Sequence, residues 1–251
     1  MRADPEIALG IRNHDAVCEM TFDGFKMYDM ITGYGVAFAA DEAWNLKGGK
    51  KGAGVVIQGF GCVGASAAFC LDKLGYKVKG IADVNRLVFC SEGLDVKKLV
   101  STKLPKGELN PDAFMPHYKE LPNSEWLSSE CDILIPAALE DVINKDNAAS
   151  VKASLIVEAA NIPTTEADKI LLGKGVDVAV DFVSNLGGIR IYEAVIFGLC
   201  DKSPKDIVDD TERIIRKNTR RVFEEAKATG EFTRDVAKRL FEPDKSDTPD
   251  F

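Results

Sequence analysis

The chain has 251 residues, 45% of them hydrophobic, which is enough for one sizeable core or one core with a small appendage. Its formal net charge of −8 excludes the basic surface of a typical nucleic-acid-binding protein, so we expect no nucleic-acid partner. No apolar run has the length of a membrane span, and residues 1–10 contain no signal-like apolar segment, so we expect a cytoplasmic protein without membrane contact.

The first informative element is a short strand followed by a glycine-rich turn. The β-branched run Val55–Ile57 predicts a buried parallel strand, and it leads directly into the pattern Gly59-x-Gly61-x-x-Gly64. In such a motif the first glycine permits a tight turn, the second lets the backbone approach a pyrophosphate, and the third lets a helix pack closely on the strand. A helix predicted from about Cys62 would direct its free N–H groups at the phosphates.

A second strand is predicted over Lys77–Ala82, and it ends at an acid. Asp83 lies about twenty residues after the last glycine, where an acid accepts from the ribose hydroxyls of a dinucleotide. Capping of the next turn is the alternative role for this residue. Its charge favours NAD over NADP because it would repel a 2′-phosphate, whereas Arg86 nearby keeps NADP open.

Short apolar strands then alternate with helical stretches. Strands are predicted over 131–137, 154–160 and 176–182, and the helical stretches between them are 140–150 and 164–174. This alternation is the βαβ rhythm of an α/β protein. We therefore expect a doubly wound, mostly parallel sheet of the Rossmann type, with C-terminal helices.

Two further helices are predicted over 187–199 and 203–228, and residues 242–251 form a polar, proline-containing tail. The buried stripe of the second helix is expected at Ile207, Ile214, Ile215 and Val222. We divide the chain into an N-terminal extension, a dinucleotide-binding domain and C-terminal helices with a polar tail, over residues 1–30, 31–200 and 201–251.

The six cysteines form no CxxC pair, and both histidines are separated from them in the sequence. We therefore expect neither a metal site nor a disulfide framework. Cys62 is the one thiol with a possible chemical role, because a helix N-terminus beside a phosphate loop lowers a thiol pKa and favours selective oxidation. The alternative is a small residue tolerated at a variable loop position.

Six segments, taken in order, resemble the glutamate/leucine/phenylalanine/valine dehydrogenase family. They are TGYGV at 32–36, VIQGFGCVGA at 56–65, EGLDV at 92–96, CDILIPAALEDVI at 131–143, VEAANIPTT at 157–165 and SNLGG at 184–188. The resemblance covers roughly residues 30–200 and implies the C-terminal NAD(P)-binding domain of an amino-acid dehydrogenase. That chemistry is the reversible oxidative deamination of an L-amino acid to a 2-oxo acid.

The resemblance also implies the residues of a cofactor site. The pyrophosphate would be lined by Gly59, Phe60, Gly61, Cys62 and Val63, with Gly64 packing the helix behind them. Asp83 would bind the adenosine ribose, and Ala137 and Ala138 would contact the middle of the cofactor. Asn161 would lie by the nicotinamide ribose, and Thr32 and Asn185 would hold the carboxamide and face the substrate. Turn or cap roles explain Asn161 and Asn185 as well.

The chain also departs from the family pattern. The residues before TGYGV contain no glycine-rich lysine motif, and we interpret the string Lys47–Gly52, which imitates it, as a solvated connector. The chain stops soon after FTRDVAKRL at 232–240, so we expect the catalytic lobe to be absent from this chain. Catalytic residues therefore stay unassigned.

Substitutions near the substrate side put substrate binding in doubt. Leu186 replaces the alanine that the family usually has, and Arg190 and Tyr192 follow where small residues are common. Ala159 and Ile162 replace glycines of the family pattern, which narrows the expected nicotinamide pocket.

Three hypotheses follow. The chain is the cofactor half of an amino-acid dehydrogenase, whose partners are NAD, an amino acid or 2-oxo acid, and a second chain with the catalytic lobe. Alternatively, it is a stand-alone oxidoreductase that reduces another carbonyl compound with Arg190 or Tyr192, or a non-catalytic NAD(H)-binding module. We favour the first and expect weak or no activity from the chain alone, because hydride transfer requires a closed, dry cleft.

Overall fold

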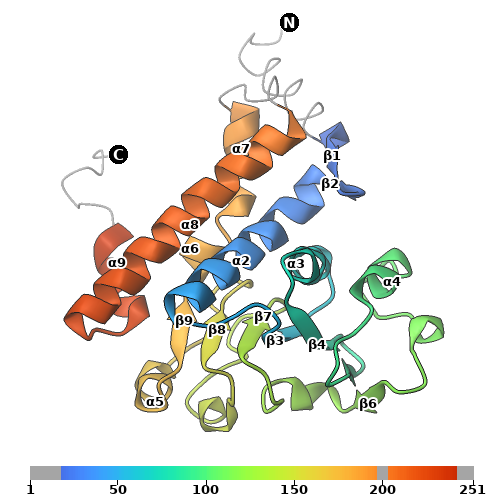
Figure 1. The fold of residues 1–251 in the computed structure, drawn as a ribbon, viewed down its shortest axis with the longest axis horizontal. Helices are drawn as coiled ribbons and strands as arrows, with labels where there is room; N and C mark the ends of the chain where they lie inside the picture. The colour runs from blue at the N-terminus through green and yellow to red at the C-terminus, as the bar shows by residue number, and fades with distance from the viewer. Residues whose placement is uncertain (1–17, 197–202, 242–251) are drawn as a thin grey trace, which may run out of the picture.

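The computed structural model describes residues 18–196 and 203–241, and a seven-stranded sheet forms its centre (Figure 1). The strand order is β6-β5-β4-β3-β7-β8-β9. The five parallel strands are β3 (Gly54–Gln58), β4 (Lys77–Ala82), β7 (Ile133–Pro136), β8 (Leu155–Val157) and β9 (Asp177–Ala179). The predicted α/β fold with a mostly parallel, Rossmann-type sheet is therefore confirmed.

Two short strands at one edge run antiparallel, and the sequence did not predict them. They are β5 (Leu87–Phe89), which pairs with β4, and β6 (Lys119–Leu121), which pairs with β5. At the other edge of the sheet the expected strands are present but shorter than predicted. Their fully buried residues are the apolar ones, which is typical of strands covered on both faces.

The chain direction across the sheet reverses beside β3. From β3 the chain passes to β4 on one side, and later to β7 on the other side, with Gln58 paired to both Ala82 and Pro136. The chain therefore builds β4, β5 and β6 on one side of β3 before it crosses to the other side with β7, β8 and β9. A crevice opens at such a switch point in open α/β sheets, and ligands bind there.

The longer helices cover one face of the sheet (Figure 1). A small hairpin of β1 (Thr21–Phe22) and β2 (Phe25–Lys26) leads into the first of them. Next to the sheet lie α2 (Met27–Leu46) and α3 (Cys62–Lys73), and α8 (Pro204–Thr229) packs along α2. The remaining helices are α4 (Val96–Ser101), α5 (Asp168–Gly173), α6 (Asp181–Ser184), α7 (Gly187–Ile196) and α9 (Thr233–Phe241). The 3₁₀ turns are η1 (Pro111–Ala113), η2 (Asn123–Trp126) and η3 (Ala148–Ser150).

The predicted helix over 140–150 is wrong. Only the last residues of that stretch, in η3, form a short 3₁₀ turn. The Asn147 Oδ1 accepts a hydrogen bond from the Asn144 N–H at 2.8 Å. Such local side-chain bonds offer the backbone an alternative to a helix, and asparagine makes them readily.

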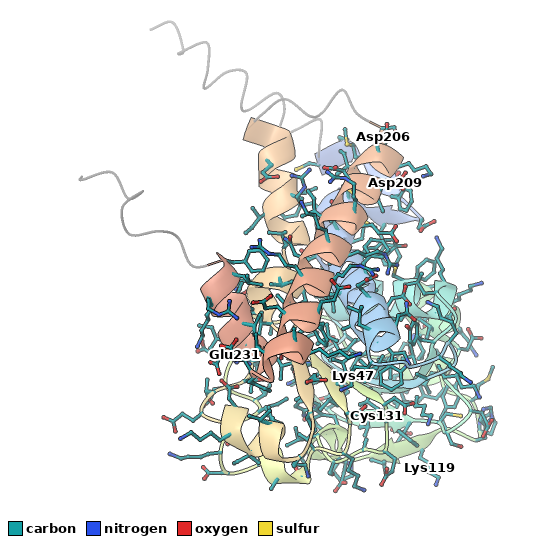
Figure 2. The ribbon with its side chains drawn as sticks, turned by 60° about the vertical axis from the view of Figure 1, so that its left-hand side comes forward. Lys47, Lys119, Cys131, Asp206, Asp209 and Glu231 are labelled. Carbon is teal, nitrogen blue, oxygen red and sulfur yellow. The ribbon has the colours of Figure 1, made fainter. Side chains whose placement is uncertain are left out.

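The C-terminal part follows the prediction closely. The stretch 203–228 forms α8, with Ser203 as its N-cap in a capping box with Asp206 and Gly230 as a left-handed C-cap. Its expected stripe is buried, except that Ile214 is half-buried. Figure 2 shows Asp206 and Asp209 at one end of α8, and Glu231 near its other end beside α9.

The proposed division at residues 30 and 31 falls inside α2, which is continuous from Met27 to Leu46. The division at residues 200 and 201, the end of the helix predicted over 187–199 and the tail 242–251 lie outside the described residues. Within the described ranges, no helix is both long and apolar enough to cross a bilayer.

Candidate functional site

Two hollows lie side by side along the carboxyl edge of the sheet. The first, of about 490 Å³, lies between the glycine turn and Asp83, and the second, of about 990 Å³, extends toward α2 and α6. They share Ala137, Ala138 and Leu139, which follow β7. We refer to them as the adenosine end and the nicotinamide end of one cleft, after the resemblance described above. The cleft coincides with the switch point beside β3.

The three glycines of the turn differ in the space around them. Gly59 has a left-handed φ of +98°, and its N–H donates to the Ala82 carbonyl at 2.7 Å. A Cβ on Gly64 would lie 2.0 Å from the Gly59 carbonyl oxygen, so only glycine fits between the turn and α3. A Cβ on Gly61 would meet nothing within 4 Å, and this residue lines the adenosine end. The open space at Gly61 is where a ligand could approach the backbone.

The other residues of the turn face different ways. Phe60 is buried at 2% exposure and is one of the residues that line the adenosine end. Val63 lines the nicotinamide end. Cys62 lines a separate hollow beside the β1–β2 hairpin, where its thiol donates to Asp29 Oδ1 at 3.5 Å.

The lowered pKa considered for Cys62 is wrong. Although the residue is exposed, partial desolvation of its sulfur raises the thiol pKa, and the charge of Asp29 raises it further. These effects outweigh the charge of the nearby Lys103 and a backbone hydrogen bond, both of which lower the pKa. The structure therefore favours the alternative of a small, tolerated residue, although Cys62 is the first residue of α3 and not part of a loop.

Asp83 is buried at 4% exposure at the end of β4, and three backbone groups surround its carboxylate. Oδ1 accepts from the N–H groups of Asn85 at 2.7 Å and Arg86 at 2.9 Å, and Oδ2 accepts from that of Leu109 at 2.8 Å. Asp83 therefore caps the turn that follows β4, which is the alternative role given above. It also lines the adenosine end, and its contact with a ribose stays a prediction.

The nicotinamide end brings together three predicted residues from three parts of the chain. Thr32 lies on α2, Asn161 follows β8, and Asn185 follows α6, and all three line the hollow. The Asn185 Nδ2 donates to Asn161 Oδ1 at 2.9 Å and is 3.4 Å from the Ala159 carbonyl oxygen. The two asparagines therefore form one polar unit at this end.

Ile162 follows Asn161 in an unusual conformation. Its φ is +47°, in the left-handed region that β-branched residues avoid. The Ile162 N–H donates to Asp181 Oδ2 at 2.7 Å, and its carbonyl accepts from the Asp141 N–H at 3.0 Å. The side chain is 59% exposed and lines the cleft, so the family glycine that it replaces would suit both the backbone and a wider pocket.

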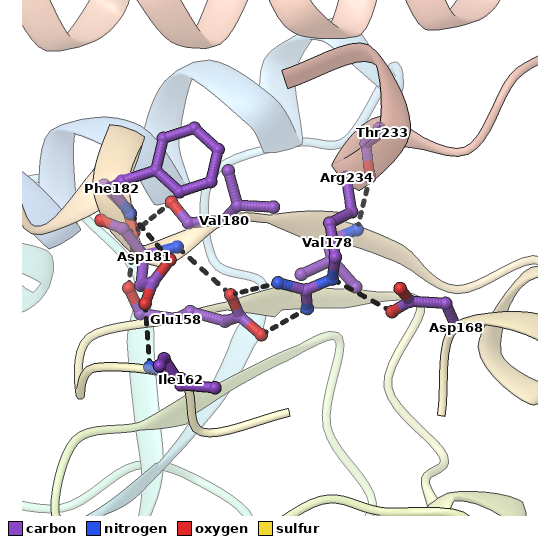
Figure 3. Close-up of polar contacts among 10 residues, drawn as sticks. Glu158, Ile162, Asp168, Val178, Val180, Asp181, Phe182, Thr233 and Arg234 are labelled. Carbon is purple, nitrogen blue, oxygen red and sulfur yellow. Dashed lines mark hydrogen bonds and ion pairs between the residues drawn. The ribbon is translucent and has the colours of Figure 1, made fainter. Parts of the chain in front are cut away.

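Glu158 and Arg234 form a buried ion pair behind this end, and the sequence did not assign them a role (Figure 3). Glu158 is fully buried in the VEAANIPTT segment, and Arg234 reaches it from the start of α9. An acid directly after the buried strand Leu155–Val157 is a signal for a buried counter-ion, because an unpaired charge there would be costly. The sequence does not tell which basic residue supplies that counter-ion.

Arg190 and the string Lys47–Gly52 are not among the residues that line the cleft. Arg190 pairs with Glu193 and with Asp210 of α8, and the Tyr192 side chain lies outside the described part. In the string Lys47–Gly52, Lys47 pairs with Asp177 and Lys51 with Asp41, which ties this connector to the sheet edge and to α2.

Among the described residues, the nicotinamide end is lined by no lysine, arginine, histidine or tyrosine. Its charged lining residues are two acids, Glu140 and Asp181. No group of three or more histidine, cysteine or acidic residues in the described part could hold a metal ion.

The sheet order and the cleft at its switch point define a Rossmann-type domain. The family model for Glutamate/Leucine/Phenylalanine/Valine dehydrogenase matches residues 24–240, and the chain belongs to this family.

The similar proteins include glutamate dehydrogenases. An NADP-specific glutamate dehydrogenase of Saccharolobus shibatae is 45% identical over 168 residues, which are 66% of this chain and 38% of that protein. The NAD-specific glutamate dehydrogenase A of Halobacterium salinarum is 40% identical over 139 residues, which are 55% of this chain and 31% of that protein. The chain thus spans less than two-fifths of the length of either relative.

A solved structure has the same arrangement of elements. Hetero-hexameric glutamate dehydrogenase from Thermus thermophilus, in its Leu-bound form, matches with a TM-score of 0.71 and 29% identity. The match covers 84% of this chain and 50% of that chain.

Proposed function

We propose that the cleft binds a nicotinamide dinucleotide, and that the chain is the cofactor-binding part of an amino-acid dehydrogenase. The observation that carries this proposal is the open space at Gly61, beside a Gly64 that tolerates no side chain. Together they leave room for a pyrophosphate against the backbone at the start of α3, where free N–H groups favour an anion. The residues present therefore fit the cofactor.

The other predicted residues take positions along the cleft in this proposal. The pyrophosphate lies against the backbone from Gly59 to Val63, with Ala137 and Ala138 beside it. The adenosine ribose lies at Asp83, whose carboxylate has about four acceptor positions and uses three of them for N–H groups. The nicotinamide ring and its ribose lie by Thr32, Asn161 and Asn185.

The chain orients the cofactor, and the chemistry needs groups from elsewhere. When bound, the nicotinamide would supply the hydride acceptor for oxidation of an amino acid. The described lining of the nicotinamide end contains no cation that could hold a substrate carboxylate, and its two charged residues, Glu140 and Asp181, would repel one. We therefore propose that a further part of the protein, or a second chain, supplies the substrate-binding and catalytic groups.

We propose NAD as the preferred cofactor. Asp83 places a negative charge at the adenosine end, and Arg86 is paired with Glu120 instead of being available to a 2′-phosphate. Lys106 lines the same hollow and makes no ion pair among the described residues, so it is the cation that a 2′-phosphate would use. A tighter affinity for NADPH than for NADH would assign Lys106 that role and overturn the preference.

The test is calorimetric titration of the full chain with NADH and NADPH, with variants at Gly61 and Gly173. Gly61→Ala should fold normally and lower NADH affinity at least about tenfold, a loss of about 1.4 kcal/mol, because its methyl group occupies the open space. Gly173→Ala is the matched control, since it also meets nothing within 4 Å but lies on α5, away from the cleft. Absence of saturable heat with wild type at about 1 mM cofactor would disprove the proposal.

A non-catalytic NAD(H)-binding module remains the second candidate, and the absence of a cationic lining residue favours it equally. Turnover distinguishes the two. Binding that gains deaminase activity when a lysine-bearing lobe of the family is added supports the dehydrogenase, whereas binding without such rescue supports the module.

A further inference from the structure

One buried carboxylate links the nicotinamide end of the cleft to the last described helix. Glu158 follows β8 and is fully buried, and its two oxygens accept from the two terminal nitrogens of Arg234 at 2.6 and 3.1 Å. This paired geometry gives two parallel charge-assisted hydrogen bonds. Figure 3 shows the guanidinium between Glu158 and Asp168, whose Oδ1 accepts from Arg234 Nε at 3.0 Å.

The same carboxylate holds the loop at the start of α6. Glu158 Oε2 also accepts from the Asp181 N–H at 3.1 Å, and the Glu158 backbone carbonyl accepts from the Ser184 hydroxyl. Asp181 and Asn185, at the two ends of this short helix, both line the nicotinamide end. Two hydrogen bonds from this short helix, at Asp181 and Ser184, therefore end on Glu158.

A second step reaches the segment that carries Asn161. The Asp181 Oδ2 accepts from the Ile162 N–H at 2.7 Å, while its Oδ1 accepts from the N–H of Phe182 (Figure 3). Ile162 has a left-handed φ of +47°, which is held only if its surroundings fix it. Three steps of hydrogen bonding thus join α9 to the Asn161 loop: Arg234 to Glu158, Glu158 to Asp181, and Asp181 to Ile162.

The helix α9 contributes the counter-ion, Arg234, to this hydrogen-bond network. Within the network the acids are Glu158, Asp168 of α5 and Asp181 of α6, and Arg234 of α9 is the one cation that the described contacts give it. Burial raises the pKa of Glu158, whereas the hydrogen bonds and the charge of Arg234 oppose that rise, so the guanidinium favours the charged, accepting form of the carboxylate. Without it, the carboxylate must take up a proton or move toward water, and either change weakens its bond to the Asp181 N–H.

We propose that Arg234 is a positioning residue for the nicotinamide end: through Glu158 and Asp181 it fixes α6 and the Asn161–Ile162 loop, and it does not act on the glycine turn. The consequence for cofactor binding rests on the proposed function, whereas the consequence for the loops does not. The adenosine end shares none of these contacts, because its turn is held by β3, β4 and α3.

The first test needs no cofactor. Amide hydrogen exchange, followed by NMR on the full chain, compares wild type with Arg234→Met and the charge-retaining Arg234→Lys. We expect the Asp181 and Ile162 amides to exchange at least about tenfold faster in Arg234→Met, and the Gly59 amide, bonded to Ala82, to keep its rate. Arg234→Lys should fall between the two. Equal acceleration at Gly59, or no acceleration at Asp181 and Ile162, overturns the proposal.

The second test separates the two ends of the ligand. ADP lacks both the nicotinamide and its ribose and so contacts only the adenosine end and the glycine turn; Arg234→Met should change its affinity less than about twofold, while NADH affinity falls about three- to thirtyfold. The double variant Glu158→Gln with Arg234→Met removes the unpaired charge but keeps an acceptor for the Asp181 N–H, so it should regain most of the NADH affinity. Equal losses for both ligands, or no rescue, contradict the proposal. If the wild-type chain binds neither ligand, the proposed function is contradicted instead. The hydrogen-exchange result then tests the role of Arg234 by itself.

Discussion

Ile162, at the nicotinamide end of the cleft, has a backbone conformation that is unfavourable for its side chain. A β-branched residue in the left-handed region carries about 1–2 kcal/mol of strain, and Ile162 has φ +47° with a side chain that is 59% exposed. Its two backbone hydrogen bonds, to Asp181 and from Asp141, keep it there. Replacing this side chain removes strain and sacrifices little buried surface.

We expect Ile162→Gly to raise the free energy of unfolding by about 0.5–1 kcal/mol, after the entropy that glycine gains in the unfolded chain is subtracted. Ile162→Ala is the matched variant, because its Cβ keeps the strain while the exposed side chain is lost. Urea denaturation of wild type and both variants measures the difference. An Ile162→Gly protein that is no more stable than Ile162→Ala would show that the backbone here is unstrained.

The role of a single residue can be predicted from the sequence when its partners are near it in the chain, and it cannot when its partners are far away. The glycine turn acts within a few positions, and its strand, turn and helix start were predicted correctly. Asp83 holds the Leu109 N–H, 26 residues away, and Glu158 pairs with Arg234, 76 residues away. No local pattern encodes those partners, because the folded sheet brings them together.

At the scale of elements, the helix α2 was not predicted from the sequence, and its composition explains why. This helix is apolar on nearly all sides, since it lies between the sheet and α8, so it has no amphipathic period to recognise. The strands β5 and β6 are three residues each, too short for a visible alternation. In contrast, α8 faces water on one side and has a capping box at its start, and its predicted and observed limits nearly coincide.

The contact between α2 and α8 is held by acids that are almost completely buried. Asp41 is 5% exposed on α2, and it accepts from Tyr76 at 2.7 Å and pairs with Lys51 and with Arg216 of α8 at 2.8 Å. Burial alone would raise its pKa, but these partners outweigh burial and lower the pKa below 3.8. The folded protein therefore binds a proton at Asp41 less readily than the unfolded chain does.

This difference gives α2 and α8 a pH-dependent contact. A carboxyl whose folded pKa is lowered stabilises the fold above its unfolded value of 3.8, and that stability is lost as the pH falls through the lower folded value. We expect Asp41→Asn to cost about 3 kcal/mol at pH 6, and the gap to wild type to narrow below pH 3.8. Urea denaturation at several pH values measures the gap. The exposed control Asp146→Asn should stay within about 0.5 kcal/mol of wild type. A gap that widens in acid would mean that Asp41 is not stabilised in its charged form.

At the scale of the molecule, exposed apolar side chains gather at the cleft. Of the eight large hydrophobic residues that are exposed in the described part, five line one of its two ends: Val84, Leu139, Ile162, Phe182 and Ile189. Apolar surface concentrated in one place marks a site that something else covers. In the proposed function the cofactor covers part of this surface, and the catalytic part of the dehydrogenase covers the rest.

This arrangement predicts binding without turnover for the chain alone. Hydride transfer is efficient only where water is excluded and the substrate is held against the ring, and the described cleft is open on that side and lacks a cation for the substrate carboxylate. We expect no measurable NADH formation from glutamate, leucine, valine or phenylalanine at cofactor concentrations that saturate wild type. A reaction mixture without the protein sets the background of the assay. Turnover clearly above that background would contradict this prediction. It would mean that groups of this chain complete the active site.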